Sequence, residues 1–152
     1  MRPVSPLAYA LRLLKVRLRS RAELDQGMQR KGFLPEERTA TLDKLVGADL
    51  VNDGRFARSW ISSRDRLAPR GAALLKMELA QKGIDKEIVE QALYERESAD
   101  DVPDEFSQAK DLVERRERQY TGLPREVRAR RLTSFLLRRG FSYGTIKRIL
   151  DS

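Results

Sequence analysis

The chain has 152 residues, of which 40% are hydrophobic and 36% are charged, and its formal net charge is +8. This balance suits small linked units with a thin core, arranged as an elongated array, better than one compact sphere. Because the sequence contains no cysteine and no histidine, it excludes disulfides, thiol nucleophiles, imidazole bases and the usual zinc sites.

No run of residues approaches the roughly 20 apolar positions of a membrane-spanning helix. The basic N-terminus is followed by neither a long apolar segment nor a small-residue cleavage site. We therefore expect a cytoplasmic protein without a membrane partner. Basic residues are concentrated at the two ends, residues 2–21 and 106–152, whereas residues 85–105 are acidic. The overall excess of positive charge favours nucleic acid, anionic lipid or an acidic protein surface as partner.

The first third of the chain predicts three helices. The helix over 7–18 has leucines at the spacing of one buried face, namely Leu7, Leu11, Leu14 and Leu18. Ser20 and Glu23 form a capping-box pattern that begins a second helix, and Gly32 ends it because glycine readily adopts the left-handed conformation. A third helix is expected over 35–46.

The middle third predicts three more helices. Asp53 is expected to cap the first, over 53–66. The second follows Gly71 and ends at Gly83, and the third begins after Asp85. Their core positions are apolar at helical spacing: Phe56, Trp60, Ile61, Leu75, Leu79, Ile88, Val89, Ala92 and Leu93.

An acidic segment over 96–104 then predicts a linker or a loop at a unit boundary, and whether it acts as a hinge is left open. Helices are expected over about 104–119, 125–139 and 142–150, with Gly140 ending the second. No segment alternates apolar and polar residues over a strand length, so we expect no sheet.

Three glycines, Gly32, Gly83 and Gly140, align a repeat whose copies lie 51 and 57 residues apart. Five aligned positions keep one residue class in every copy, for example Leu24, Leu75 and Leu132. Any helix–glycine–helix hairpin gives some leucines at this spacing, but five matched positions favour a true repeat. We predict an all-α fold of three tandem three-helix repeats, about nine helices in all, with units at 1–50, 51–98 and 99–152.

No combination of residues in the sequence indicates a catalytic site. Asp53 fits a helix cap, and Asp100 and Asp101 fit a solvated loop, better than either fits metal or acid–base work. No phosphate-binding glycine loop is present. Trp60 is expected to pack in the core, with base stacking as the alternative. We expect no enzyme activity, no cofactor and no metal.

Arginines are the candidate binding residues. In the helix over 125–139, four of them form a stripe beside the apolar face with no acid inside it. Such a stripe is either a binding surface or a means of solubility, and arginine suits phosphate and carboxylate equally. Six further arginines could extend the surface. The ten candidates are Arg17, Arg19, Arg21, Arg64, Arg66, Arg70, Arg128, Arg130, Arg131 and Arg138.

The sequence resembles the RecX family of regulators of the RecA recombinase. The resemblance rests on N-D-G-R-F-A at 52–57, R-G at 70–71, E-L-A-Q-K-G-I at 78–84, residues 10–24, and L-L-R-R-G-F at 136–141. One departure is Asn52, where the family commonly has a second aspartate.

The resemblance implies curved, elongated tandem repeats that bind along the RecA–DNA filament, within its groove. It also implies modulation, usually inhibition, of recombination, ATPase and co-protease activity in DNA repair and the SOS response, with no catalytic residues. The alternative is a stand-alone basic module that binds single- or double-stranded DNA directly. In either case we expect a monomer.

Overall fold

The computed structural model describes residues 4–99 and 103–152, and over these residues it contains helices and no strand. The elements in chain order are α1 (Pro6–Val16), α2 (Arg21–Arg30), α3 (Pro35–Gly47), α4 (Asp53–Leu67), α5 (Ala72–Gln81), α6 (Lys86–Glu97), α7 (Glu105–Arg116), the 3₁₀ turn η1 (Glu117–Tyr120), α8 (Arg125–Arg138) and α9 (Tyr143–Asp151). They form three successive units, α1–α3, α4–α6 and α7–α9. The predicted all-α fold of tandem three-helix units is confirmed.

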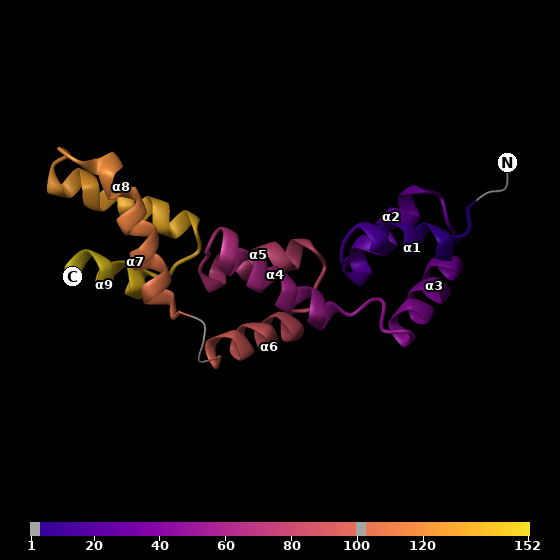
Figure 1. The fold of residues 1–152 in the computed structure, drawn as a ribbon. Helices are drawn as coiled ribbons and strands as arrows, with labels where there is room; N and C mark the ends of the chain where they lie inside the picture. The colour runs from indigo at the N-terminus through magenta and orange to yellow at the C-terminus, as the bar shows by residue number, and fades with distance from the viewer. Residues whose placement is uncertain (1–3, 100–102) are drawn as a thin grey trace.

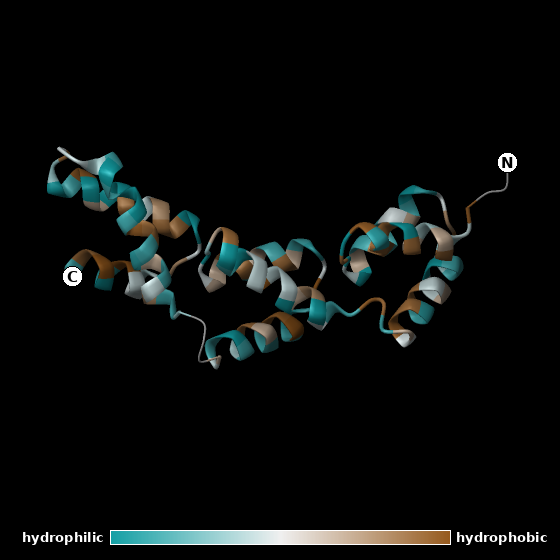
Figure 2. Ribbon diagram, viewed as in Figure 1, coloured by the Kyte–Doolittle hydropathy of each residue, from teal (hydrophilic) through white to brown (hydrophobic). Residues whose placement is uncertain are grey.

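The three units follow one another in an elongated row, with the two termini at opposite ends (Figure 1). Each unit has its own small core, and apolar and polar segments alternate along the individual helices (Figure 2). The aligned leucines Leu24, Leu75 and Leu132 are completely buried, one in each core. Because each core is small, stability also depends on contacts between neighbouring units.

The predicted inward face of the first helix is wrong for three of its four leucines, whereas Leu14 packs against the core of the first unit. Leu7 and Leu11 lie at the surface, and α1 ends at Val16, before Leu18. The buried residue is Ala10, and Tyr9 packs beside it with its ring centroid 6.0 Å from that of Phe33. The spacing of the leucines did not identify the buried face, because apolar residues surround most of α1. Contact with α2 and α3 determines which face is buried.

Three further local expectations need correction. Asn52, not Asp53, caps α4, since its side-chain oxygen accepts from the Arg55 amide at 3.0 Å. Asp85 occupies the cap position of α6 but its side chain accepts no capping hydrogen bond. The helix expected over 104–119 ends as α-helix at Arg116 and continues as η1.

The expected linker over 96–104 is partly helical, because α6 continues to Glu97. Asp104, at its other end, caps α7 by accepting from the Ser107 amide at 2.8 Å. Asp100 and Asp101 lie outside the described residues.

Two equivalent joints connect the units. In the first joint, the hydroxyl of Ser20, which caps α2, donates to the carbonyl of Lys82 at 2.6 Å. In the second joint, the amide of Gly71, which caps α5, donates to the carbonyl of Arg139 at 2.7 Å. Each acceptor precedes a repeat glycine. The cap of one middle helix therefore holds the glycine turn of the next unit.

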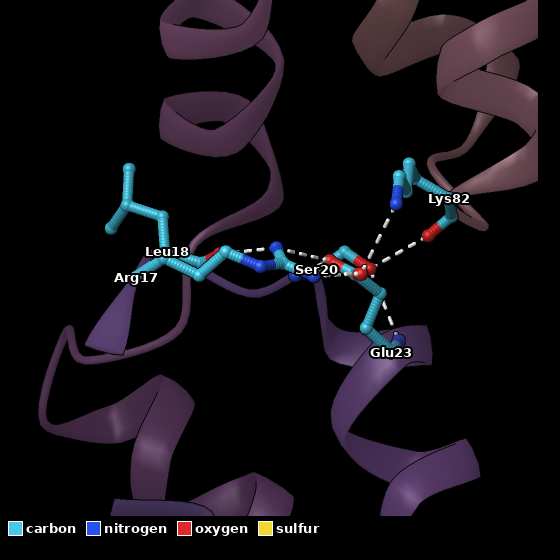
Figure 3. Close-up of polar contacts among 5 residues, drawn as sticks. All are labelled: Arg17, Leu18, Ser20, Glu23 and Lys82. Carbon is cyan, nitrogen blue, oxygen red and sulfur yellow. Dashed lines mark hydrogen bonds and ion pairs between the residues drawn. The ribbon is translucent and has the colours of Figure 1, made fainter. Parts of the chain in front are cut away.

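The first joint also carries charge (Figure 3). Glu23 receives the Ser20 amide at 3.2 Å, which completes the predicted capping box, and pairs with Arg17 at 2.7 Å and with Lys82 of the next unit at 3.4 Å. The amide of Arg21 donates to Asp53 across the same joint at 2.9 Å. Asp53 therefore links two units instead of capping its own helix.

The second joint has very little space. A Cβ atom on Gly71 would lie 2.1 Å from the carbonyl oxygen of Gly140, and one on Gly140 would lie 2.4 Å from the amide nitrogen of Leu74. Arg96 reinforces the joint by pairing with Asp65 at 2.7 Å and donating to Gln108 of the third unit at 2.8 Å. Ordinary side chains cannot replace these glycines without moving the units apart.

Candidate basic binding surface

The ten predicted arginines do not form one continuous stripe. Among the described residues, several are held in ion pairs: Arg17 with Glu23, Arg21 with Asp43, Arg64 and Arg70 with Glu78, and Arg128 with Glu117. Those of Arg17, Arg64 and Arg70 contribute to the joints or to packing around Trp60, so they are less available to a partner.

The contacts of the first joint lower the pKa of the Glu23 carboxyl. Burial acts to raise the pKa of the Glu23 carboxyl, but hydrogen bonds from Arg17 and the Ser20 amide outweigh it. The positive charges of Arg17 and Lys82 act in the same direction, so the pKa lies below its ordinary value. The carboxylate is therefore stabilised in its charged form at neutral pH.

Trp60 lies in a set of contacts within the second unit. Its ring stacks on Phe56 with centroids 6.0 Å apart, and the cations of Arg64 and Lys82 lie 4.6 and 5.3 Å from its centre. Its indole N–H donates to Glu78 at 3.1 Å. These contacts favour a packing role for Trp60 over base stacking, because neighbouring side chains already contact the ring and accept a hydrogen bond from its N–H.

A different group of arginines surrounds a surface hollow of about 620 Å³ between the end of α7, η1 and α8. We call it the arginine hollow and define it by Arg116, Arg130, Arg131 and Arg138. The other lining side chains are neutral: Gln119, Tyr120, Val127 and Ser134.

Three of the four arginines predicted on α8 thus come together, whereas Arg128 turns to Glu117. Within the described part of the chain, Arg130, Arg131 and Arg138 are exposed and take part in no ion pair. Arg116 was missed because it belongs to another helix; the Arg115-Arg116 pair in the last turn of α7 is a weak local signal.

Positive charge continues from the arginine hollow to the second joint. The guanidinium of Arg116 lies 4.0 Å from the centre of the Phe135 ring, and that of Arg139 lies 5.5 Å from it. Burial, and then the charges of Arg70 and Arg116, lower the pKa of Arg139. Arginines of the second and third units are therefore close enough to repel one another.

The remaining predicted arginines are isolated from this group. Arg66 is exposed on α4. Arg19 is half-buried, and its Nε atom has no hydrogen-bond partner within the described residues.

Residues 4–99 and 103–152 contain no group of three or more acidic, histidine or cysteine side chains suited to a metal ion. Over the same ranges, none of the helices has the length and apolar character needed to cross a membrane.

Comparison with known proteins gives three family matches in chain order. Models of the first, second and third three-helix domains of RecX match residues 7–45, 52–93 and 103–150. The protein named Regulatory protein RecX from Amycolatopsis mediterranei (strain U-32) is 38% identical over 134 residues, which are 87% of this chain and 73% of that protein. The protein of the same name from Thermobifida fusca (strain YX) is 38% identical over 145 residues, covering 94% and 75%.

The fold is shared as well. The crystal structure of RecX from Lactobacillus salivarius matches with a TM-score of 0.84 at 26% identity, covering 96% of this chain and 92% of that one. The order of the matched domains, the sequence identities and the common architecture together show that the chain belongs to the RecX family.

Proposed function

We propose that this protein regulates the RecA recombinase, in the inhibitory sense, by binding the RecA–DNA filament. The observation that carries the proposal is the ordered match of three RecX domains, supported by relatives that are named regulatory proteins. The protein would act as a monomer in the cytoplasm, within DNA repair and the SOS response, and without a cofactor.

The architecture is suited to this role. The two joints are built from short hydrogen bonds and close backbone contacts, so the units present their surfaces in a fixed arrangement. Such preorganisation lowers the entropy lost when an elongated partner is bound. A filament groove that offers acidic protein surface and DNA phosphates complements the positive charge of the third unit.

Regulation would follow from binding alone. A protein that prefers one state of the filament shifts the filament toward that state by its difference in affinity, and no chemical step is needed. Recombination, ATP hydrolysis and co-protease activity would all fall if the preferred state were inactive or incomplete.

Co-sedimentation with RecA assembled on single-stranded DNA tests this proposal. We expect the protein to pellet with the filament in the presence of a non-hydrolysable ATP analogue, and to lower DNA strand exchange in a parallel assay. A protein that stays in the supernatant and leaves strand exchange unchanged would contradict the proposal.

The arginine hollow favours a second activity, which is direct binding of DNA. Four arginines line it, and its lining includes no acidic residue from the described part of the chain. Binding measured without RecA should weaken steeply as salt is raised, because phosphate contacts release counterions. Affinity that is insensitive to salt would argue against it.

A further inference from the structure

The arginine hollow concentrates positive charge that the protein itself does not neutralise. Arg130, Arg131 and Arg138 take part in no ion pair within the described residues, whereas Arg128, on the same helix, does. Like charges held close together cost free energy unless an anion occupies the space between them. The arrangement therefore favours a negatively charged ligand in the hollow.

Two features favour phosphate over carboxylate. The first is the spacing of the charges. Arg131 and Arg138 are two turns apart on α8, about 10 Å along the helix axis. One DNA strand has a phosphate about every 3.4 Å along its axis, so this distance corresponds to about three phosphates. The second is the neutral lining by Gln119, Tyr120 and Ser134, side chains of the kinds that contact phosphate and sugar oxygens.

The contact that restrains the Arg116 side chain also fits a preformed site. Its guanidinium lies 4.0 Å from the centre of the Phe135 ring, and Phe135 is buried in the core of the third unit. A cation held against a core aromatic loses less side-chain freedom when it meets an anion. Arg116 thus contributes a more restricted cation to the lining of the hollow than the exposed arginines of α8 do.

We propose that the arginine hollow binds about three successive phosphates of one nucleic-acid strand, and that α8 with η1 is the DNA-contacting end of the molecule. This inference rests on the second proposed activity, direct DNA binding, and assigns that activity to one end of one unit. Arg130, Arg131 and Arg138 contact the phosphates, and Arg116 orients the strand.

The test compares two triple variants of the full chain. The first, Arg130→Gln/Arg131→Gln/Arg138→Gln, removes charge from the hollow. The matched control, Arg12→Gln/Arg30→Gln/Arg58→Gln, removes the same charge from exposed arginines elsewhere for which the described residues provide no ion pair. Circular dichroism melting should be the same for both, because all six side chains are exposed.

Fluorescence anisotropy of a labelled oligo(dT) of about 30 nucleotides gives the affinity over a range of salt concentrations. For the hollow variant we expect a loss of about tenfold or more at about 0.1 M salt, and a salt slope smaller by about 2, from roughly 0.7 for each of three contacts. The control variant should lose less than about threefold and keep most of its slope.

Equal losses in the two variants would overturn the proposal, since they would show diffuse attraction only. Unchanged affinity of the hollow variant would overturn it as well. If the hollow variant kept its DNA affinity but no longer pelleted with RecA filaments, the hollow would instead bind an acidic protein surface. Failure of the oligonucleotide test with filament binding intact would leave RecA regulation standing and remove only the phosphate site.

Discussion

We predict that the substitution Gly140→Ala disrupts the second joint. Gly140 has a φ of +86°, and a Cβ atom there would lie 2.4 Å from the Leu74 amide nitrogen and 2.4 Å from the Leu74 Cβ. Because one of these neighbours is backbone, the clash cannot be relieved by turning a side chain. The second and third units must move apart.

A matched control separates the two costs of this substitution. Gly32 has a similar φ of +92°, but a Cβ atom there has nothing within 4 Å. Gly32→Ala therefore has only the conformational cost of a left-handed alanine, about 1–2 kcal/mol. Gly140→Ala has that cost together with overpacking, typically a further 1–3 kcal/mol. We expect a total of about 2–5 kcal/mol, or a joint that opens to avoid the clash.

Urea unfolding followed by circular dichroism gives the loss of stability, and hydrogen exchange locates it. The Gly71 amide donates to Arg139 across the joint, so its protection should fall in Gly140→Ala and persist in Gly32→Ala. Equal destabilisation of the two variants, with protection of the Gly71 amide unchanged, would refute the joint as described.

Three other predictions concern the first two units. Leu24→Ala should lower the free energy of unfolding in urea by about 2–5 kcal/mol, because Leu24 is buried. Leu11→Ala should lower it by well under 1 kcal/mol, because Leu11 is 41% exposed. Equal losses would show that Leu11 belongs to the buried face of α1. Asn52→Ala should cost about 1 kcal/mol by removing the cap of α4, and no measurable loss would contradict that cap. The pKa of Glu23 is lowered in the folded state, so its stabilising effect is present above the ordinary value of about 4.5 and is lost as pH falls through the folded value. The stability difference between the wild type and Glu23→Gln should therefore shrink as the pH falls below about 4.5, and a difference independent of pH would show that the charge of Glu23 does not matter.

Much of the fold could be predicted because its signals are local. The Ser20–Glu23 capping box needs only four consecutive residues, and a glycine after an amphipathic helix fixes where that helix ends. The aligned leucines repeat those signals in each unit. Where local signals were redundant, as in α1 with apolar residues on most sides, tertiary contact decided and the prediction failed.

The candidate site could be predicted only in part, because it depends on contacts between elements far apart in the sequence. The α8 stripe predicted from helix periodicity included Arg130, Arg131 and Arg138, and these three side chains line the arginine hollow. The ion pair that withdraws Arg128 and the approach of Arg116 both involve residues of the preceding helix and η1. The role of Asp53 across the first joint was hidden for the same reason.

ATP hydrolysis by RecA on single-stranded DNA tests the central claim most directly. This protein is titrated into the reaction, beginning well below the RecA concentration. We expect hydrolysis to slow at sub-stoichiometric amounts, because one elongated molecule bound along a filament would act on several RecA subunits. ATP hydrolysis that stays unchanged at saturating protein would contradict the claim that this chain regulates RecA.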